Sequence, residues 1–318
     1  MIKFVLGGVA VLLAAWIGVG FAIVALAGPF KPGGRLVDIG GRKLRLVCEG
    51  PASDKPVVWM EAGAWGLAAD FAAIQQGLAA RGVRSCAYDR AGMGFSDPGP
   101  SPRDSTAIAA DLASLMKASG ERGPFILMAH SMGGQHVRLF AGQHPQLVAG
   151  LVLLDGTTPE MLSNPRADAF LAGVRNVARA TAAAGSIGLT RAAYYWGDRI
   201  GLPPQGSAEK RHAFVSGRHA RTSADEVLAW TAGAEQAGGV SLDPNWPVAV
   251  VTAGDPKLMA EFNTYRRAPE LASRSGFYVS IPEASHTSML GLECSGPILT
   301  AVDQVIAAAG TSPSRRGG

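Results

Sequence analysis

Short runs of continuously apolar residues, separated by stretches with helical spacing, constrain this 318-residue chain more than any other feature. Four of these runs read PVVWM, PFILMA, VAGLVLL and PVAVVTA and lie at 56–60, 124–129, 148–154 and 247–253. A strand that is apolar at every position is buried on both faces, and such strands occur in parallel sheets that helices cover on each side. The sequence therefore predicts an α/β fold with a mostly parallel central sheet.

A hairpin and further elements complete the predicted alternation of strands and helices. The hairpin is expected over 35–48, around a pair of glycines. A helix is expected over 105–118 because Ile108, Leu112 and Leu115 share one face at helical spacing. The remaining expected elements are helices at about 68–80, 132–143 and 297–309 and strands at 83–88 and 277–281.

The alternation stops between two of the predicted core strands. From about 156 to 245 the chain is Ala-rich, with helical stretches and no convincing strand. Ligands of open α/β sheets bind outside the carboxyl ends of the strands, so we expect this insertion to form a helical cap over that edge. The main domain with its cap is then predicted to span 31–310, and the small, polar residues 311–318 are expected to form a disordered tail.

The first 30 residues are predicted to be a membrane segment that precedes this domain. Residues 4–27 contain no ionisable side chain, and as a helix they would reach about 36 Å, enough to cross a hydrocarbon core of about 30 Å. A cleaved secretory signal is the alternative, because Ala25-Leu26-Ala27 offers a cleavage site. The length of the uncharged run favours a single-pass anchor over a signal peptide, whose apolar region is usually about 7–15 residues.

Charge leaves the orientation of that segment open. Lys31, Arg35 and Arg42 follow it while Lys3 precedes it, and by the positive-inside rule the excess would keep the domain cytoplasmic. Lys3 and the α-amine oppose that assignment. The net charge of +4 is scattered and does not alternate with aromatic residues, so no nucleic-acid partner is expected.

The three cysteines, Cys48, Cys86 and Cys294, form no CxxC pair and lie in apolar surroundings. We interpret them as buried small hydrophobic residues that carry no information on the redox compartment. No metal-ligand spacing is present among the histidines, and neither a metal nor a cofactor is expected.

The clearest chemical motif is Ala129-His130-Ser131-Met132-Gly133, between the PFILMA strand and a predicted helix. It has the pattern of a nucleophile elbow, G-x-S-x-G, with alanine at the first glycine. In this sharp strand-to-helix turn a serine is held in a strained conformation with its Oγ above the sheet. The N–H of Met132, at the start of the helix, is positioned to stabilise an oxyanion.

Together with the motif YDRAGMGFS at 88–96, which is similar to a glycine-rich Asp-Arg-x-Gly-x-Gly-x-Ser loop, this elbow resembles the α/β-hydrolase fold superfamily. The resemblance covers about 35–309, and we assign Asp89 and Arg90 no chemical role. It implies a second oxyanion donor in the loop after the strand at 56–60. That loop lacks the family's usual His-Gly, so the main-chain N–H of Gly63 or Ala64 is expected to serve.

The resemblance also implies a general base and an acid after the last strands. His286 follows the strand at 277–281 and is the expected base. Two residues compete for the acid: Asp255, in the loop after the strand at 247–253, and Asp155, directly after the strand at 148–154. Either could orient the imidazole and stabilise its charged form. We lean slightly toward Asp255.

This constellation predicts a serine hydrolase that cleaves a carboxylic ester through an acyl-enzyme. Ser131 argues against the dehalogenases and epoxide hydrolases of the same fold, which carry aspartate at the nucleophile position. An acyltransferase with the same triad is the alternative, followed by a membrane-tethered binding protein without activity. Aromatic residues in the cap, among them Trp196 and Trp230, suggest a hydrophobic substrate.

Overall fold

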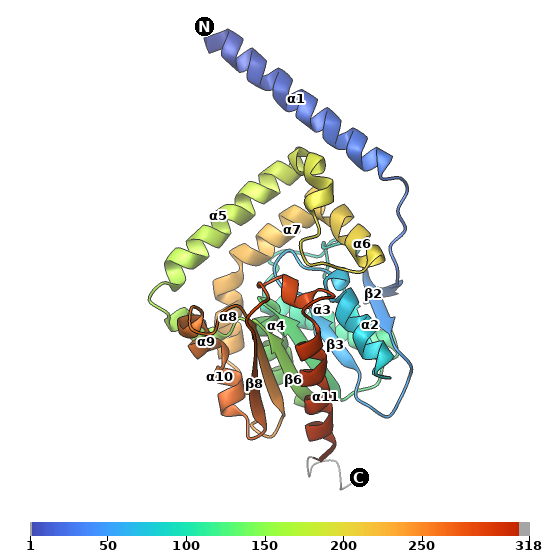
Figure 1. Cartoon of the computed structure of the whole chain (residues 1–318), viewed down its shortest axis with the longest axis vertical. Coiled ribbons are helices and arrows are strands. Elements are labelled where there is room, and N and C mark those ends of the chain that lie inside the picture. The colour runs from blue at the N-terminus through green and yellow to red at the C-terminus, as the bar shows by residue number, and fades with distance from the viewer. Residues whose placement is uncertain (1, 312–318) are drawn as a thin grey trace.

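The computed structural model describes residues 2–311 and builds them around an eight-stranded sheet (Figure 1). The strand order is β1-β2-β4-β3-β5-β6-β7-β8. β1 and β2 form the antiparallel hairpin, β2 pairs antiparallel with β4, and all other pairs are parallel. The bounds are Arg35–Asp38 (β1), Lys43–Glu49 (β2), Val58–Glu61 (β3), Ser85–Tyr88 (β4), Phe125–His130 (β5), Val148–Leu154 (β6), Val248–Ala253 (β7) and Gly276–Ile281 (β8). The prediction of a mostly parallel α/β sheet is confirmed.

Helices cover both faces of the sheet, as the continuously apolar strands require. Alternate residues of one strand point to opposite faces, so Met60 of β3 packs in one core and its neighbour Trp59 in the other. The first core includes side chains of α2 (Ala72–Ala80) and α11 (Gly296–Thr311), and the second those of α3 (Ser105–Ser119) and α4 (Gly133–Gln143). Each fully buried aliphatic or aromatic side chain contributes about 1.5–3 kcal/mol to such a core.

The interpretation of Cys48 and Cys86 as separate buried residues is wrong. They lie directly opposite each other in the antiparallel pair of β2 and β4 and form a disulfide, while Cys294 is free. Adjacent antiparallel strands bring opposed Cα atoms within bonding range of a disulfide. The pairing was not readable from the sequence because the two residues are 38 positions apart and the register of β2 against β4 was unknown.

The segment between β6 and β7, residues 156–245, lies over the carboxyl ends of the parallel strands and is called the cap below (Figure 1). Its elements are η3 (Pro159–Ser163), α5 (Ala167–Ser186), η4 (Leu189–Trp196), α6 (Pro204–Phe214), α7 (Gly217–Leu228) and α8 (Trp230–Gly238). Two short helices that the sequence analysis did not predict, α9 (Ala260–Arg266) and α10 (Ala268–Ala272), follow β7. The expected disordered tail, 311–318, lies outside the described residues except for Thr311, the last residue of α11.

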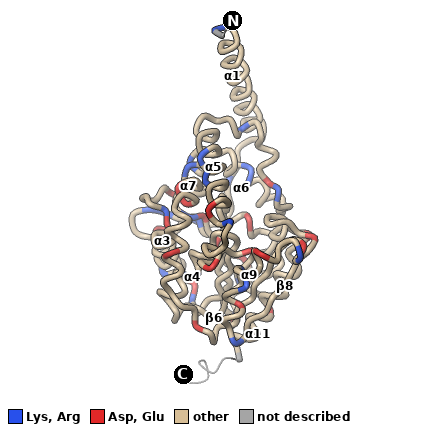
Figure 2. Tube along the Cα trace, turned by 90° about the vertical axis from the view of Figure 1, so that its left-hand side faces the viewer, with Lys and Arg blue, Asp and Glu red and all other residues tan. Residues whose placement is uncertain are grey.

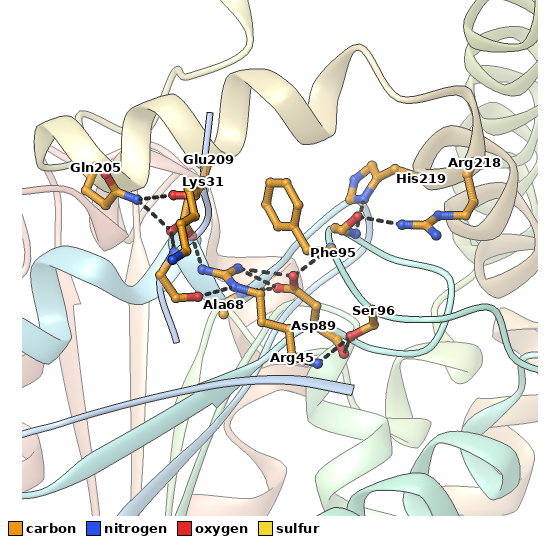
Figure 3. A network of polar contacts seen from close by, with 12 residues as sticks. Lys31, Arg45, Ala68, Asp89, Phe95, Ser96, Gln205, Glu209, Arg218 and His219 are labelled. Carbon is orange, nitrogen blue, oxygen red and sulfur yellow. Dashed lines mark hydrogen bonds and ion pairs between the residues drawn. The ribbon is translucent and has the colours of Figure 1, made fainter. Parts of the chain in front are cut away.

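A buried arginine ties the cap to the core and to the chain that enters it (Figure 3). The Arg45 guanidinium is 2% exposed, pairs with Asp89 of the core at 3.1 Å and with Glu209 of α6, and donates to the carbonyl of Gly33 at 2.8 Å. Glu209 in turn accepts the Gly33 N–H at 2.9 Å. Since two carboxylates and a carbonyl satisfy one buried cation, the linker after residue 30 is fixed against the cap.

The N-terminal helix α1 (Ile2–Leu26) extends away from the cap (Figure 1) and carries charge only near its N-terminus (Figure 2). Within the described residues it is the one helix long and apolar enough to cross a membrane, over Lys3–Leu26. Its second half contacts η4: the indole N–H of Trp16 donates to the Leu189 carbonyl at 3.0 Å, and the Arg191 guanidinium lies 3.8 Å from the Phe21 ring centroid.

Candidate active site

Ser131 stands at the turn between β5 and α4, where its backbone has a φ of +52°. Its N–H donates to the Leu154 carbonyl at the end of β6, at 3.0 Å, and its own carbonyl accepts the Thr157 N–H at 2.8 Å. These bonds hold a left-handed conformation that costs a non-glycine residue of order 1–2 kcal/mol. The serine is thereby fixed at the carboxyl edge of the sheet, as a nucleophile elbow requires.

The loop after β3 packs against the serine. A β-carbon on Gly63 would lie 2.8 Å from that of Ser131, so only glycine fits there. In the described part of the chain, the main-chain N–H groups of Gly63, Ala64 and Met132 donate to no protein acceptor. Unpaired main-chain donors beside a serine are what an oxyanion hole supplies.

The structure brings His286 together with Asp155. The imidazole Nδ1 lies 2.8 Å from Asp155 Oδ2, and because a carboxylate only accepts, Nδ1 carries the proton and Nε2 is left for another partner. Asp155 is 2% exposed, whereas the His286 side chain is 44% exposed. A buried carboxylate therefore orients a solvent-accessible imidazole.

The structure does not bring Asp255, the acid toward which the sequence analysis leaned, to the histidine. Its carboxylate is exposed and accepts the N–H of Lys257, two residues further on, at 2.8 Å. No hydrogen bond joins it to His286 among the described residues. Asp155 follows β6, which is next to the serine strand β5, whereas Asp255 follows β7, one strand further away. The positive φ of Asp155, +45°, turns the chain directly after β6.

Two further groups hold the second oxygen of Asp155. Oδ1 pairs with the Arg266 guanidinium of α9 at 2.9 Å and accepts the Ala253 N–H at 3.1 Å. Burial alone would raise the pKa of this carboxyl, but the hydrogen bond from His286 and the charge of Arg266 outweigh it and lower the pKa of Asp155. Asp155 is thus held as an anion. The sequence offered no signal for Arg266, because α9 was not predicted.

His130, which the sequence analysis did not place in the site, contacts the main chain of His286. Its Nε2 lies 2.8 Å from the His286 carbonyl and must donate to it, and the two rings are 4.6 Å apart. Burial, helped by the nearby His286, lowers the pKa of His130 to about 3. His130 therefore remains a neutral donor across the physiological range.

A second buried arginine, to which we had assigned no chemical role, braces the loop of Gly63. Arg90 donates to the carbonyls of Ala62 at 2.6 Å and Gly63 at 2.8 Å. It also pairs with Glu61 at 2.7 Å and, in a bidentate contact, with Glu226 of α7 at 2.7 and 2.9 Å. Burial raises the pKa of Glu61 although Arg90 pulls it down. The residues that replace the family's His-Gly are thus part of an ion-pair cluster that reaches into the cap.

Two cavities meet at Ser131 and His286. One has a volume of about 580 Å³ and is lined on the cap side by Phe170, Trp196 and Phe214. The other, of about 480 Å³, lies toward α9. Both also share Phe170 and Trp230, so two of the predicted cap aromatics, Trp196 and Trp230, line the site.

Backbone strain is concentrated at this place. Among the described non-glycine residues, positive φ angles occur at Trp65, Ser131 and Asp155, and all three belong to the site or its loop. Residues in such conformations are typical of functional sites. By contrast, the one described group with three potential metal ligands, Cys48, Cys86 and Glu121, is remote from the serine, and its thiols are joined in the disulfide.

The chain belongs to the alpha/beta hydrolase fold family, which it matches over residues 56–291. Among solved structures, the enol-lactonase of Burkholderia xenovorans LB400 is 19% identical with a TM-score of 0.60, over 86% of this chain and 100% of that one. A putative epoxide hydrolase of Pseudomonas aeruginosa (a t131d mutant) is 19% identical with a TM-score of 0.66, over 90% of this chain and 100% of the other. At this identity the likeness concerns the fold.

Curated relatives match only in part. An uncharacterised protein of Schizosaccharomyces pombe, C23C11.06c, is 37% identical over 83 residues, which are 26% of this chain and 15% of that protein. The next two matches also span less than half of the relative's length, 40% and 18%. These relatives therefore agree with the chain over a segment and do not extend the comparison to a whole protein.

Proposed function

We propose that the protein is a serine hydrolase that cleaves a carboxylic ester, with Ser131 as nucleophile, His286 as base and Asp155 as acid. The observation that carries the proposal is the 2.8 Å contact between His286 Nδ1 and the buried Asp155, which line the cavity of about 480 Å³ together with Ser131. That contact fixes the tautomer with a free Nε2, which is the form able to take a proton from serine.

The reaction follows in two halves. Ser131 Oγ bonds to the ester carbonyl carbon as His286 Nε2 takes the hydroxyl proton, and the main-chain N–H groups near Gly63 and Met132 stabilise the oxyanion. The C–O bond to the alcohol then breaks, and the alcohol leaves with the proton from His286. Water, activated by the same imidazole, attacks the acyl-enzyme and releases the acid and free Ser131. The exposed His286 is accessible to that water.

The two cavities support an ester with two apolar parts. They lie on either side of the serine and histidine, so one can hold the acyl group and the other the alcohol. An epoxide or haloalkane would require a carboxylate nucleophile, and Ser131 cannot form an alkyl-enzyme ester that water reopens in the way those reactions need.

The proposal is tested with p-nitrophenyl esters of increasing chain length and a fluorophosphonate probe. The wild type should hydrolyse them and be labelled, while Ser131→Ala should do neither and His286→Ala should lose several orders of magnitude in kcat. A wild type that is as inert as both variants and takes up no probe would refute the proposal.

The acid is tested by a matched pair of variants. Asp155→Asn should lower kcat by about 10³–10⁴-fold, because the amide no longer orients and stabilises the charged imidazole. Asp255→Asn changes the same chemical group at an exposed position and should leave kcat within about twofold. Equal effects, or the reverse order, would contradict the assignment of Asp155.

We further infer that α1 anchors the chain in a membrane and that the domain faces an oxidising compartment. The span Lys3–Leu26 supports the anchor, and the Cys48–Cys86 disulfide supports the outward orientation, since disulfides rarely persist in the cytosol. The basic residues after the span are a weak counter-argument because Arg42 and Arg45 are committed to ion pairs in the fold. Protease protection of the domain in sealed inside-out vesicles, together with a disulfide seen on non-reducing gels, would support this topology.

A further inference from the structure

The part of the cap nearest α1 has an unusual charge pattern. Between Asp168 and Asp198 the chain contains three arginines, Arg175, Arg179 and Arg191, and no acidic residue. This stretch comprises most of α5 and all of η4, and it lies at the end of the molecule from which α1 extends (Figure 2). In space, Arg179 lines one hollow with Arg218 and Arg221 of α7 and a single acid, Asp225. This face therefore has a net positive charge, which attracts anionic lipid headgroups.

The same stretch exposes large apolar side chains. Val177, Ile187, Tyr195 and Trp196 are 55%, 56%, 57% and 66% exposed. Tyr and Trp favour the membrane–water interface, where the ring meets apolar chains and the polar atom meets water. Arg175 is half-buried and donates to Thr231 of α8 at 2.7 Å, so it does not belong to this surface. We call the four apolar residues, together with Arg179 and Arg191, the cap tip.

The contacts of α1 set the depth of the cap tip if the helix crosses a membrane. Trp16 bonds to Leu189 ten residues before the end of α1, and Phe21 meets Arg191 five residues before it. At about 1.5 Å per residue, η4 thus lies alongside the last ~8–15 Å of the helix. The helix is about 6 Å longer than a ~30 Å hydrocarbon core. With all of that excess at this end, these contacts lie about 2–9 Å inside the acyl boundary, which is the depth of an interfacial amphipathic helix.

One residue of the cap tip, Trp196, also lines the cavity at Ser131, whereas Ile187 and Tyr195 do not. Trp196 is 66% exposed and lines the cavity of about 580 Å³, together with its neighbours Ala193 and Gly197 and with Phe214, itself 38% exposed. One side of the same short helix therefore belongs to the outer surface and the other to the space that ends at Ser131. A molecule that leaves the bilayer beside η4 would meet this wall first.

We propose that the cap tip docks on the surface of the membrane that holds α1, and that the substrate is an ester dissolved in that membrane, which enters the cavity past η4. The substrate class rests on the proposed ester hydrolase activity, whereas the docking does not. The occupant of the surface is a lipid bilayer with anionic headgroups, as the arginines and the adjoining span indicate.

Docking is tested by fluorescence of the full chain in vesicles of phosphatidylcholine and phosphatidylglycerol. In a Cys294→Ser background, Ile187→Cys carries an environment-sensitive NBD label, and Leu271→Cys is the matched control, an exposed aliphatic position (67%) on α10. At 187 the emission should shift to the blue and be quenched by lipids with a nitroxide on the acyl chain; at 271 it should do neither. If the label at 187 showed the same emission wavelength and the same lack of quenching as the label at 271, the proposal would be overturned.

Substrate entry is tested with one ester series in two physical states. The double variant Ile187→Asp/Tyr195→Asp should hydrolyse a long-chain ester embedded in the vesicles at least tenfold more slowly, and a soluble short-chain ester within about twofold of the wild type. Leu271→Asp should change neither rate. Equal rates of the double variant and wild type on the embedded ester would overturn entry past η4.

The two tests separate the proposals. If no ester is hydrolysed but the label at 187 is quenched, the ester hydrolase proposal fails and docking stands. If soluble esters are hydrolysed and the label stays in water, the hydrolase proposal stands and the docking of the cap tip fails.

Discussion

Arg45 and Arg90 form the same kind of buried ion-pair bridge at two places in the molecule, but they bind different parts of the backbone. Each is 2% exposed, and each bridges one carboxylate of the core and one of the cap: Asp89 and Glu209 for Arg45, Glu61 and Glu226 for Arg90. Ion pairs of this kind are costly to desolvate and contribute little net stability, but breaking one leaves a buried charge without its partner.

The difference lies in the carbonyls that each guanidinium binds. Arg45 holds Gly33, in the linker from α1, whereas Arg90 holds Ala62 and Gly63, next to Ser131. The first clamp therefore joins the cap to the linker after α1, and the second joins the cap to the Gly63 loop, which we propose supplies an oxyanion donor. Similar ion pairs fix the cap against the linker at one place and against the candidate active site at the other.

The largest expected difference is in catalysis. Arg90→Met should lower kcat on a soluble short-chain ester by at least about 100-fold, the scale of losing an oxyanion donor, because the Gly63 loop loses its brace. Arg45→Met removes the same charge and should keep kcat within about threefold. Steady-state kinetics of both folded variants measures this, and equal losses would show that both clamps act only through stability.

Acid should destabilise the fold through two buried histidines, His130 at the end of β5 and His219 of α7 in the cap. Burial lowers the pKa of His130, and of His219 beside Trp65, from 6.5 to about 3. The unfolded chain takes up these protons below pH 6.5 while the folded chain does not, so stability is full above pH 6.5 and falls as the pH drops from 6.5 toward 3. Between pH 7.5 and 5 each histidine should cost about 2 kcal/mol.

Urea unfolding at the two pH values measures this loss. His219→Gln should show a smaller difference between pH 7.5 and 5 than the wild type, whatever its stability at pH 7.5. A variant whose stability depends on pH as steeply as that of the wild type would contradict a neutral buried His219.

Neutralising the cap carboxylates should reveal a smaller effect, similar at both clamps. Glu226→Gln and Glu209→Gln each keep the side-chain shape but leave a buried guanidinium with a single carboxylate, at a cost of about 1–2 kcal/mol in unfolding free energy. Only Glu226→Gln should also lower kcat, by about tenfold. Chemical denaturation and kinetics on the same samples test the pair, and a drop in kcat for Glu209→Gln would break the distinction.

The smallest effect concerns the linker. Glu209 accepts the Gly33 N–H, and Gln205 donates to the Lys31 carbonyl at 3.3 Å. Glu209→Gln should therefore speed hydrogen exchange at the Gly33 amide several-fold, corresponding to about 1 kcal/mol of local opening. In Glu226→Gln this amide should exchange at the wild-type rate, and equal acceleration would mean that the two clamps open together.

The sheet and its elbow were predictable because local patterns determine them. Runs that are apolar at every position predicted the buried parallel strands, and the places of Ser131 and His286 followed from where those strands end. The disulfide, the Arg266 contact and the two arginine clamps were not predictable. Each depends on residues from distant elements, and their register and orientation are set by tertiary packing that no local pattern encodes.

The choice of the carboxylate that partners His286 illustrates this limit of local sequence patterns. Asp155 and Asp255 both follow core strands, and the sequence pattern favoured Asp255 slightly. In the structure, Asp155 has a positive φ and its carboxylate contacts His286. The Asp255 carboxylate instead accepts the N–H of Lys257 in its own loop. Such choices between neighbouring strand ends require coordinates.

The positive φ angles at Ser131, Asp155 and Trp65 have a further consequence for how the chain can evolve. A glycine at any of these positions would adopt the same backbone without steric conflict. Ser131→Gly should thus be inactive yet at least as resistant to denaturation as the wild type. Loss of the proposed nucleophile would then cost this fold no stability, so folding stability alone does not account for a serine at this position.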